Sequence, residues 1–105
     1  MEGPVGVSKM PRDPHQAILR VLLADADVSL IGSGQRSWSS ATFQGARHSF
    51  RLRTTTCEIP PGLAGISEQL FAIDGHLVAD IAVTAHDADR DGSVIRIEAL
   101  TVEAE

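Results

Sequence analysis

The chain has 105 residues, a net charge of −5 and hydrophobic side chains at 43% of its positions. These values are typical of one folded domain and argue against global disorder. The single cysteine, Cys57, excludes an internal disulfide framework and a cysteine-rich zinc site. No apolar run approaches the roughly 18 residues of a membrane span. Because the N-terminus also lacks the apolar core and cleavage signature of a signal peptide, we expect a cytoplasmic protein without membrane contact.

Charge is distributed unevenly along the chain. Residues 1–57 carry seven Lys and Arg against four acids, whereas residues 58–105 carry two arginines against ten acids. The two halves therefore have net charges of +3 and −8. Either the halves complement one another within one domain, or the surface is polarised and steers a charged partner.

The first residues predict an arm followed by a helix. Residues 1–12 contain two glycines and two prolines without hydrophobic periodicity, which predicts a flexible N-terminal arm before a single α+β domain at residues 13–105. Asp13 is a suitable helix cap and Pro14 suits the first helical position. The apolar residues that follow recur on one side of a helix, namely Ile18, Leu19, Leu22 and Leu23. We expect this helix to end near Ala24, because the acids that follow are unfavourable at a helix C-terminus.

Two extended segments follow, and their register decides where the single tryptophan points. Residues 48–53 alternate between apolar and basic side chains, which predicts a half-buried strand returning as a hairpin. We favour a register that pairs Trp38 with Phe50 and buries the tryptophan. A tighter turn would pair Trp38 with Arg51 on the outer face instead, because a slip of one residue reverses every side chain.

The second half repeats the same order of elements. Apolar residues at helical spacing between Leu63 and Ile73 predict a helix of about three turns, with Gly75 as its left-handed cap. Two alternating strands then flank an acidic turn, and near Ala99, where the alternation reverses, we expect either a bulge or burial of both faces. The fold prediction is α+β in the order αββαββ, with a four-stranded antiparallel sheet and two helices packed on one face. Exposed edge strands invite partner strands, so a homodimer through a sheet edge is expected.

The acidic turn has the spacing of a calcium-binding loop. The segment 87–98 places Asp87, Asp89, Asp91 and Glu98 at the carboxylate positions of D-x-D-x-D-G-x5-E, and over these twelve residues it resembles an EF-hand loop. The flanking residues alternate with period two, however, which is typical of strands rather than of the helices that such a loop requires. Two interpretations remain: an acidic hairpin turn, or a weak calcium site. Calcium is the only cofactor that the sequence suggests.

Histidine and cysteine chemistry is not supported by the spacing of these residues. His76 and His86 lie about 33 Å apart on a straight strand, too far to share an ion. Cys57 stands in a threonine-rich connector, and the chain has no serine-nucleophile elbow, phosphate-binding glycine loop or zinc-helix motif. We therefore expect no catalytic machinery.

Arginines on alternating strand positions are the remaining candidate for recognition. Such arginines can hold carboxylates or phosphates through paired hydrogen bonds, and the candidate anion-binding residues are Arg36, Arg47, Arg51 and Arg53. The net charge of −5 argues against nucleic acid, as does the lack of exposed aromatics unless Trp38 faces outward. The sequence thus predicts a non-catalytic binding or self-association domain. Weak calcium binding, and anion or nucleic-acid binding by the arginines, are the alternatives.

Overall fold

The computed structural model describes residues 13–104, so the predicted N-terminal arm at residues 1–12 lies outside the described residues. The elements follow one another as α1 (Pro14–Leu22), β1 (Val28–Ser39), β2 (Gln44–Thr54), α2 (Pro61–Ala64), the 3-10 turn η1 (Glu68–Leu70), β3 (His76–Asp89) and β4 (Gly92–Glu103). The four strands form one antiparallel sheet in the order β1-β2-β4-β3. The predicted α+β class and the αββαββ order are confirmed.

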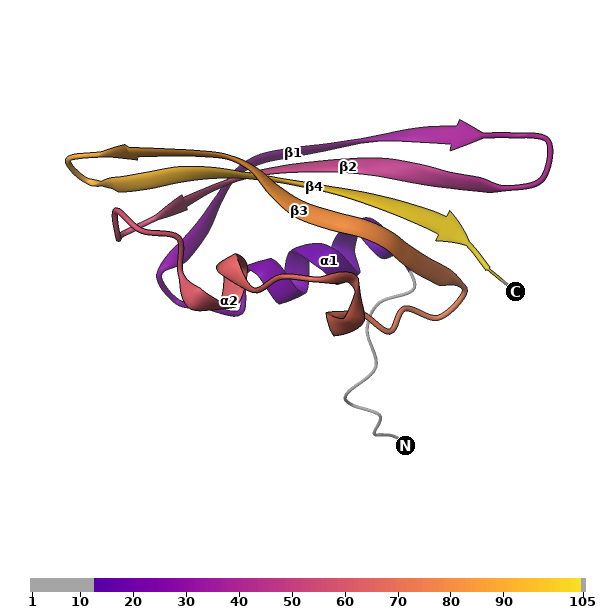
Figure 1. The fold of residues 1–105 in the computed structure, drawn as a ribbon, viewed down its shortest axis with the longest axis horizontal. Helices are drawn as coiled ribbons and strands as arrows, with labels where there is room; N and C mark the ends of the chain where they lie inside the picture. Colours follow the sequence, from indigo (N-terminus) through magenta and orange to yellow (C-terminus); the bar gives the residue numbers. More distant parts are fainter. Residues whose placement is uncertain (1–12, 105) are drawn as a thin grey trace.

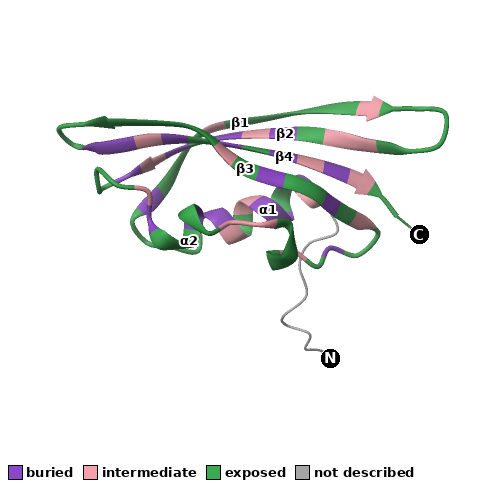
Figure 2. Ribbon diagram, viewed as in Figure 1, coloured by how far each residue is buried: buried purple, intermediate pink, exposed green. Residues whose placement is uncertain are grey.

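Both helices lie on the same side of the sheet, and no described element lies over the opposite side (Figure 1). Buried positions alternate along the two central strands, with Phe50 and Leu52 on β2 and Ile95 and Ile97 on β4. Ile18 of α1 is fully buried with them in one apolar cluster. The edge strand β1 is exposed along most of its length (Figure 2). Among residues 13–104, no helix has the length and apolar character needed to cross a membrane.

The first helix begins as its capping signal predicts. The Asp13 side chain accepts hydrogen bonds from the backbone N–H groups of His15 at 2.9 Å and Gln16 at 3.5 Å. These bonds satisfy two of the donors that every helix start leaves without an intrahelical partner. The helix ends at Leu22, two residues before the predicted end, and its buried side packs on the sheet.

The predicted second helix is wrong in length. The segment forms one turn of helix at Pro61–Ala64 and a separate 3-10 turn at Glu68–Leu70. Gly65 follows the first turn directly, and glycine costs about 1 kcal/mol relative to alanine inside a helix. Gly75 has a positive φ of 80°, as predicted, but it leads into β3 rather than capping a helix.

The preferred register of the first hairpin is also wrong. Trp38 pairs with Gly45, not with Phe50, and the turn spans residues 40–43. The Ser40 hydroxyl accepts a hydrogen bond from the backbone N–H of Phe43 at 3.0 Å, which closes the turn earlier than the Gln-Gly dipeptide would. Trp38 therefore lies on the face opposite the helices, as in the alternative register, although its partner there is Gly45 rather than Arg51.

The irregularities of the second hairpin lie in β3 rather than near Ala99. Strand β3 has 14 residues and β4 has 12, and the register shifts between Val78 and Asp80 and again between Val83 and Ala85. Ala99 sits in a regular part of β4 without a bulge, and Leu100 and Val102 are half-buried beside the buried Ala99 and Thr101, as the alternative of two-sided burial predicts. Two bulges on the longer edge strand accommodate its extra residues, and bulges of this kind are common at sheet edges.

Candidate functional site

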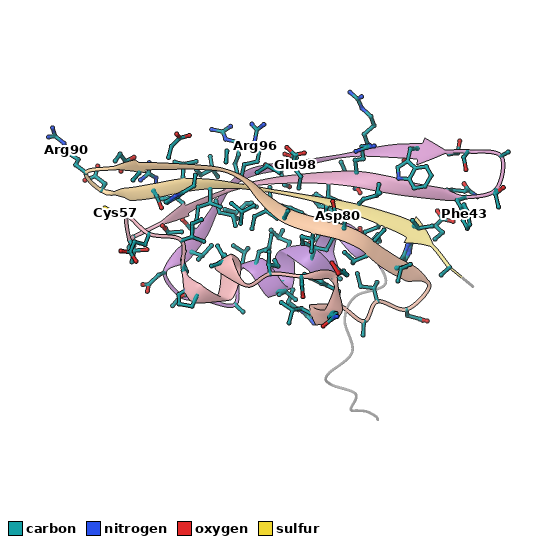
Figure 3. The ribbon with its side chains drawn as sticks, in the orientation of Figure 1. Phe43, Cys57, Asp80, Arg90, Arg96 and Glu98 are labelled. Atoms are coloured by element: carbon teal, nitrogen blue, oxygen red, sulfur yellow. The ribbon has the colours of Figure 1, made fainter. Side chains whose placement is uncertain are left out.

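The sheet side that faces away from the helices, here called the open face, is ordered in rows across the four strands. Its side chains alternate with the buried positions of β2 and β4, so the strand pairing fixes each row. Reading from β1 through β2 and β4 to β3, the rows are Trp38-Gly45-Val102-Leu77, Arg36-Arg47-Leu100-Asp80, Gly34-Ser49-Glu98-Ala82, Gly32-Arg51-Arg96-Ala85 and Ser29-Arg53-Val94-Asp87. Figure 3 shows Arg96 and Glu98 pointing away from the helices.

Arginines of the open face stand opposite other arginines. All four predicted anion-binding residues lie on this face, and Arg96, which the sequence analysis left out, joins them. Arg36 is the direct cross-strand partner of Arg47, and Arg51 is the partner of Arg96. Among residues 13–104, no ion pair is formed by Arg36, Arg47, Arg51 or Arg96. Like charges directly opposite one another destabilise a sheet, so this arrangement has a cost that no described residue offsets.

Arg53 differs from the other four because it has a counter-ion. Its guanidinium donates to both carboxylate oxygens of Asp89, at 2.9 and 3.4 Å. This hydrogen bond lowers the pKa of Asp89, and the backbone N–H of Asp91 lowers it further. The same contact raises the pKa of Arg53. Arg53 therefore ties β2 to the tip of the second hairpin and is less available to a ligand than the unpaired arginines.

The open face divides into two halves of different charge. The basic half, formed by β1 and β2, contains Arg36, Arg47, Arg51 and Arg53 and no acid. The acidic half, formed by β4 and β3, contains Asp80, Asp87 and Glu98 together with Arg96. A depression of about 160 Å³ lies where the halves meet, and its lining includes Arg47, Asp80, Thr84 and Glu98.

An apolar row borders the charged part of the open face. Trp38 lies against Gly45, where an added Cβ would stand 2.9 Å from the tryptophan ring. The Trp38 Nε1 is buried and has no hydrogen-bond partner within residues 13–104. Leu77, at the other end of the row, is 58% exposed. Tryptophan and arginine on one surface are the residue types most enriched where proteins bind one another.

The candidate calcium loop is a hairpin whose carboxylates are spread out. Only Arg90 and Asp91 separate β3 from β4, and Asp89 is held by Arg53. Glu98 lies six residues along β4 from Gly92, about 20 Å away at the rise of a strand. Among residues 13–104, no three side chains of metal-binding type are grouped closely enough to hold an ion. The structure does not bring Asp87, Asp89, Asp91 and Glu98 together, and calcium binding here stays a prediction.

A pair of histidines lies between α1 and the sheet, and the sequence analysis missed it. The Nδ1 atoms of His15 and His48 are 2.9 Å apart. His15 Nε2 lies 2.9 Å from Ser33 Oγ, and His48 Nε2 lies 2.9 Å from Thr101 Oγ1. The rings stack on one another and on Phe50. One signal was present in the sequence: His48 occupies the apolar parity of its strand, with Phe50 and Leu52.

One direction of the hydrogen-bond chain keeps the contact of Thr101 with the carbonyl oxygen of Ala46. Thr101 donates to the carbonyl oxygen of Ala46, so its oxygen accepts from His48 Nε2–H. His48 Nδ1 then accepts from His15 Nδ1–H, and His15 Nε2 accepts from the hydroxyl of Ser33. Burial lowers the pKa of His48 to about 4, and the neighbouring His15 adds to this effect. Burial also lowers the pKa of His15, against an opposing effect of Asp13.

The order of Ser33, His15 and His48 resembles that of a nucleophile, a base and an orienting group. A serine nucleophile needs donors placed for the oxyanion that forms. The nearest candidates are the amides at the start of α1, and Asp13 accepts from those of His15, Gln16 and Ala17. The only thiol, Cys57, is exposed and donates to the carbonyl of Asp89 at 3.7 Å. The histidine pair is therefore best explained as a buried structural link between α1, β1, β2 and β4.

Comparison of the chain with protein-family models, with curated proteins and with solved structures finds no significant match.

Proposed function

We propose that this chain is a non-catalytic binding domain whose open face takes a carboxylate-bearing protein on its arginines. The observation that supports it is the pair of cross-strand arginine contacts, Arg36 with Arg47 and Arg51 with Arg96. Each contact costs stability in the free chain, and places where a sequence departs from local stability are often functional. An acidic partner would convert this repulsion into charge-assisted hydrogen bonds.

The composition of the open face favours a protein partner. The face has five arginines, one tryptophan and no lysine. Protein interfaces are enriched in arginine and tryptophan and depleted of lysine. Glycine, alanine and serine at the intervening positions, such as Gly34, Ser49 and Ala82, leave room for a second surface to approach closely.

Single-stranded nucleic acid is the competing occupant, because Trp38 lies on the open face and aromatic side chains stack on bases. Asp80 and Glu98 stand within the same face and would repel phosphates. The net charge of −5 acts in the same direction. These charges favour the protein partner.

Fluorescence anisotropy with a labelled polyglutamate peptide tests the proposal. We expect salt-sensitive binding, and we expect the double variant Arg47→Ala/Arg51→Ala to bind on the order of tenfold more weakly. Arg20→Ala is the control: it removes one positive charge, against two in the double variant, from an exposed position on α1, and binding should not change. An equal loss in the control, or no binding by the wild-type chain, would overturn the proposal. Tighter binding of a single-stranded oligonucleotide, also lost in the double variant, would reassign the face to nucleic acid.

A further inference from the structure

We propose that the partner of the open face is a second copy of this chain, packed open face to open face about a twofold axis parallel to the strands. This inference rests on the proposed function and names the source of the carboxylates. It is argued from the division of the open face into a basic and an acidic half.

The direction of the axis follows from the charges. A twofold axis parallel to the strands places β1 over β3 of the partner and β2 over β4, so each basic half faces an acidic half. An in-plane axis perpendicular to the strands through the central row would place Arg47 over Arg51 of the partner subunit and Glu98 over Glu98 of the partner subunit, and no arginine over a carboxylate. Because like charges across an interface cost several kcal/mol, the first axis, which places Arg36 over Asp80 of the partner subunit, is favoured.

The rows then face themselves in reverse order, and one contact in each half of the dimer joins opposite charges. Arg36 lies over Asp80 of the partner subunit, and Ser49 lies over Glu98 of the partner subunit. Arg47 lies over Leu100 of the partner subunit, where the stem of the arginine packs on the leucine. Aligned sheets cross at about 30°, so the match is closest in the central rows, which contain these residues.

Side-chain size matches as well as charge. Trp38 lies over Leu77 of the partner subunit, so the exposed leucine is covered by the half-buried tryptophan. Gly45 lies beneath Val102 of the partner subunit, and Gly34 lies over Ala82 of the partner subunit. Large groups thus meet small or apolar ones, as close packing of two sheets about 10 Å apart requires.

The size of the face is sufficient for a dimer. Four strands at about 4.8 Å spacing and five rows at about 6.7 Å cover roughly 600 Å² of flat surface per subunit. The total is about 1,200 Å², the lower end of the range of specific stable interfaces. A dimer of moderate affinity is expected.

One row of the open face is repulsive in the dimer, and a variant in this row distinguishes the dimer from other occupants of the face. Arg51 lies over Arg96 of the partner subunit, so this row is repulsive in the dimer. Arg96→Glu should therefore tighten the dimer, although it weakens the binding of any free anion to the same face. No other occupant of the open face predicts this opposite pair of effects.

Sedimentation velocity over a concentration series measures the dissociation constant of the dimer. We expect wild-type chain to dimerise, with Arg36→Asp and Asp80→Arg each weakening the dimer at least about tenfold and the double exchange restoring it. Arg96→Glu should lower the dissociation constant. Circular dichroism of each variant shows that the fold is retained, and Arg20→Asp on α1 controls for net charge.

Each outcome is informative. A dimer that is unchanged in Arg36→Asp and Asp80→Arg uses another surface, such as an edge strand, and overturns the inference. A chain that stays monomeric but binds polyglutamate also overturns it, while the proposed function stands. A chain that stays monomeric and binds no polyglutamate contradicts both.

Discussion

The two faces of the sheet differ in how many polar side chains they carry and in whether these are paired. On the face covered by the helices, polar side chains are few and paired: His15, His48 and Thr101 form one hydrogen-bond chain, and Thr54 bonds to Ser93 at 2.8 Å. On the open face, charges are many, and four of five arginines lack a counter-ion among residues 13–104. Unpaired polar groups are costly when buried and cheap in water. The covered face is therefore arranged for stability, and the open face retains features that stability alone does not explain.

The largest expected effect on stability distinguishes two adjacent residues of β2, Phe50 and Arg51. Phe50 is fully buried under α1, whereas Arg51 is exposed on the open face. Phe50→Ala should lower the free energy of unfolding by about 3–5 kcal/mol, because it leaves a cavity and removes the ring that stacks on both histidines. Arg51→Ala should change it by less than about 0.5 kcal/mol. Urea denaturation measures both, and similar losses in the two variants would contradict the assignment of the faces.

Acid should act on the covered face through the histidine pair. The pKa of His48 is lowered to about 4, mainly by burial, from an ordinary value of 6.5. The unfolded chain therefore binds more protons between pH 6.5 and 4, and the stability contributed by neutral His48 is complete above pH 6.5 and lost as the pH falls towards 4. The loss is on the order of 2–3 kcal/mol, and His15, Asp13 and His76 also face this group.

Urea denaturation as a function of pH measures this effect. His48→Gln should be less stable at neutral pH and should show a flatter profile between pH 6.5 and 4. His86→Gln removes an exposed histidine and should retain the wild-type profile. A wild-type slope in His48→Gln would assign the acid sensitivity to other groups, such as His15, whose pKa burial also lowers.

The sequence predicted the features that local rules determine. The Asp13 cap, the alternation of β2 and the order of elements depend on residues close together in the chain, and all three are observed. The positions of Arg47, Arg51 and Arg53 on one face also follow from the strand pattern, whereas that of Arg36, and its opposition to Arg47, depends on the register of the hairpin. That contact depends on the register, and the register depends on how the Ser40 side chain closes the turn.

The remaining errors concern contacts between distant residues. His15 and His48 are 33 positions apart, and only the docking of α1 on the sheet brings them together. The bulges of β3 follow from its pairing with a strand two residues shorter, which the alternation of a single strand does not reveal. The helical spacing between Leu63 and Ile73 predicted that both residues are buried, and they are. The segment between them, however, forms two short turns instead of one helix.

The glycines of the open face differ in the room that they leave for a side chain. A Cβ added at Gly45 would overlap the backbone carbonyl of Thr101 and approach the Trp38 ring, whereas one at Gly34 would meet nothing within 4 Å. Gly45→Ala should therefore cost about 1–3 kcal/mol, because backbone must move. Gly34→Ala should change the free energy of unfolding by less than about 0.5 kcal/mol. Thermal unfolding of the two variants compares them, and equal stability would show that the tryptophan does not hold β2 closely.

The smallest expected effect is a gain. Arg51 stands opposite Arg96 without a counter-ion among residues 13–104, so Arg51→Gln should raise the free energy of unfolding of the dilute chain by a few tenths of a kcal/mol. Arg53→Gln is the matched control two residues along β2, and it should give no gain because it removes the ion pair with Asp89. The difference between the variants should shrink at high salt, which screens exposed charges. Unfolding at low and high salt measures it, and a gain in both variants would mean that the cross-strand contact of Arg51 with Arg96 is not its source. A gain confined to Arg51→Gln would show that the open face retains a locally unfavourable contact, as expected of a binding surface.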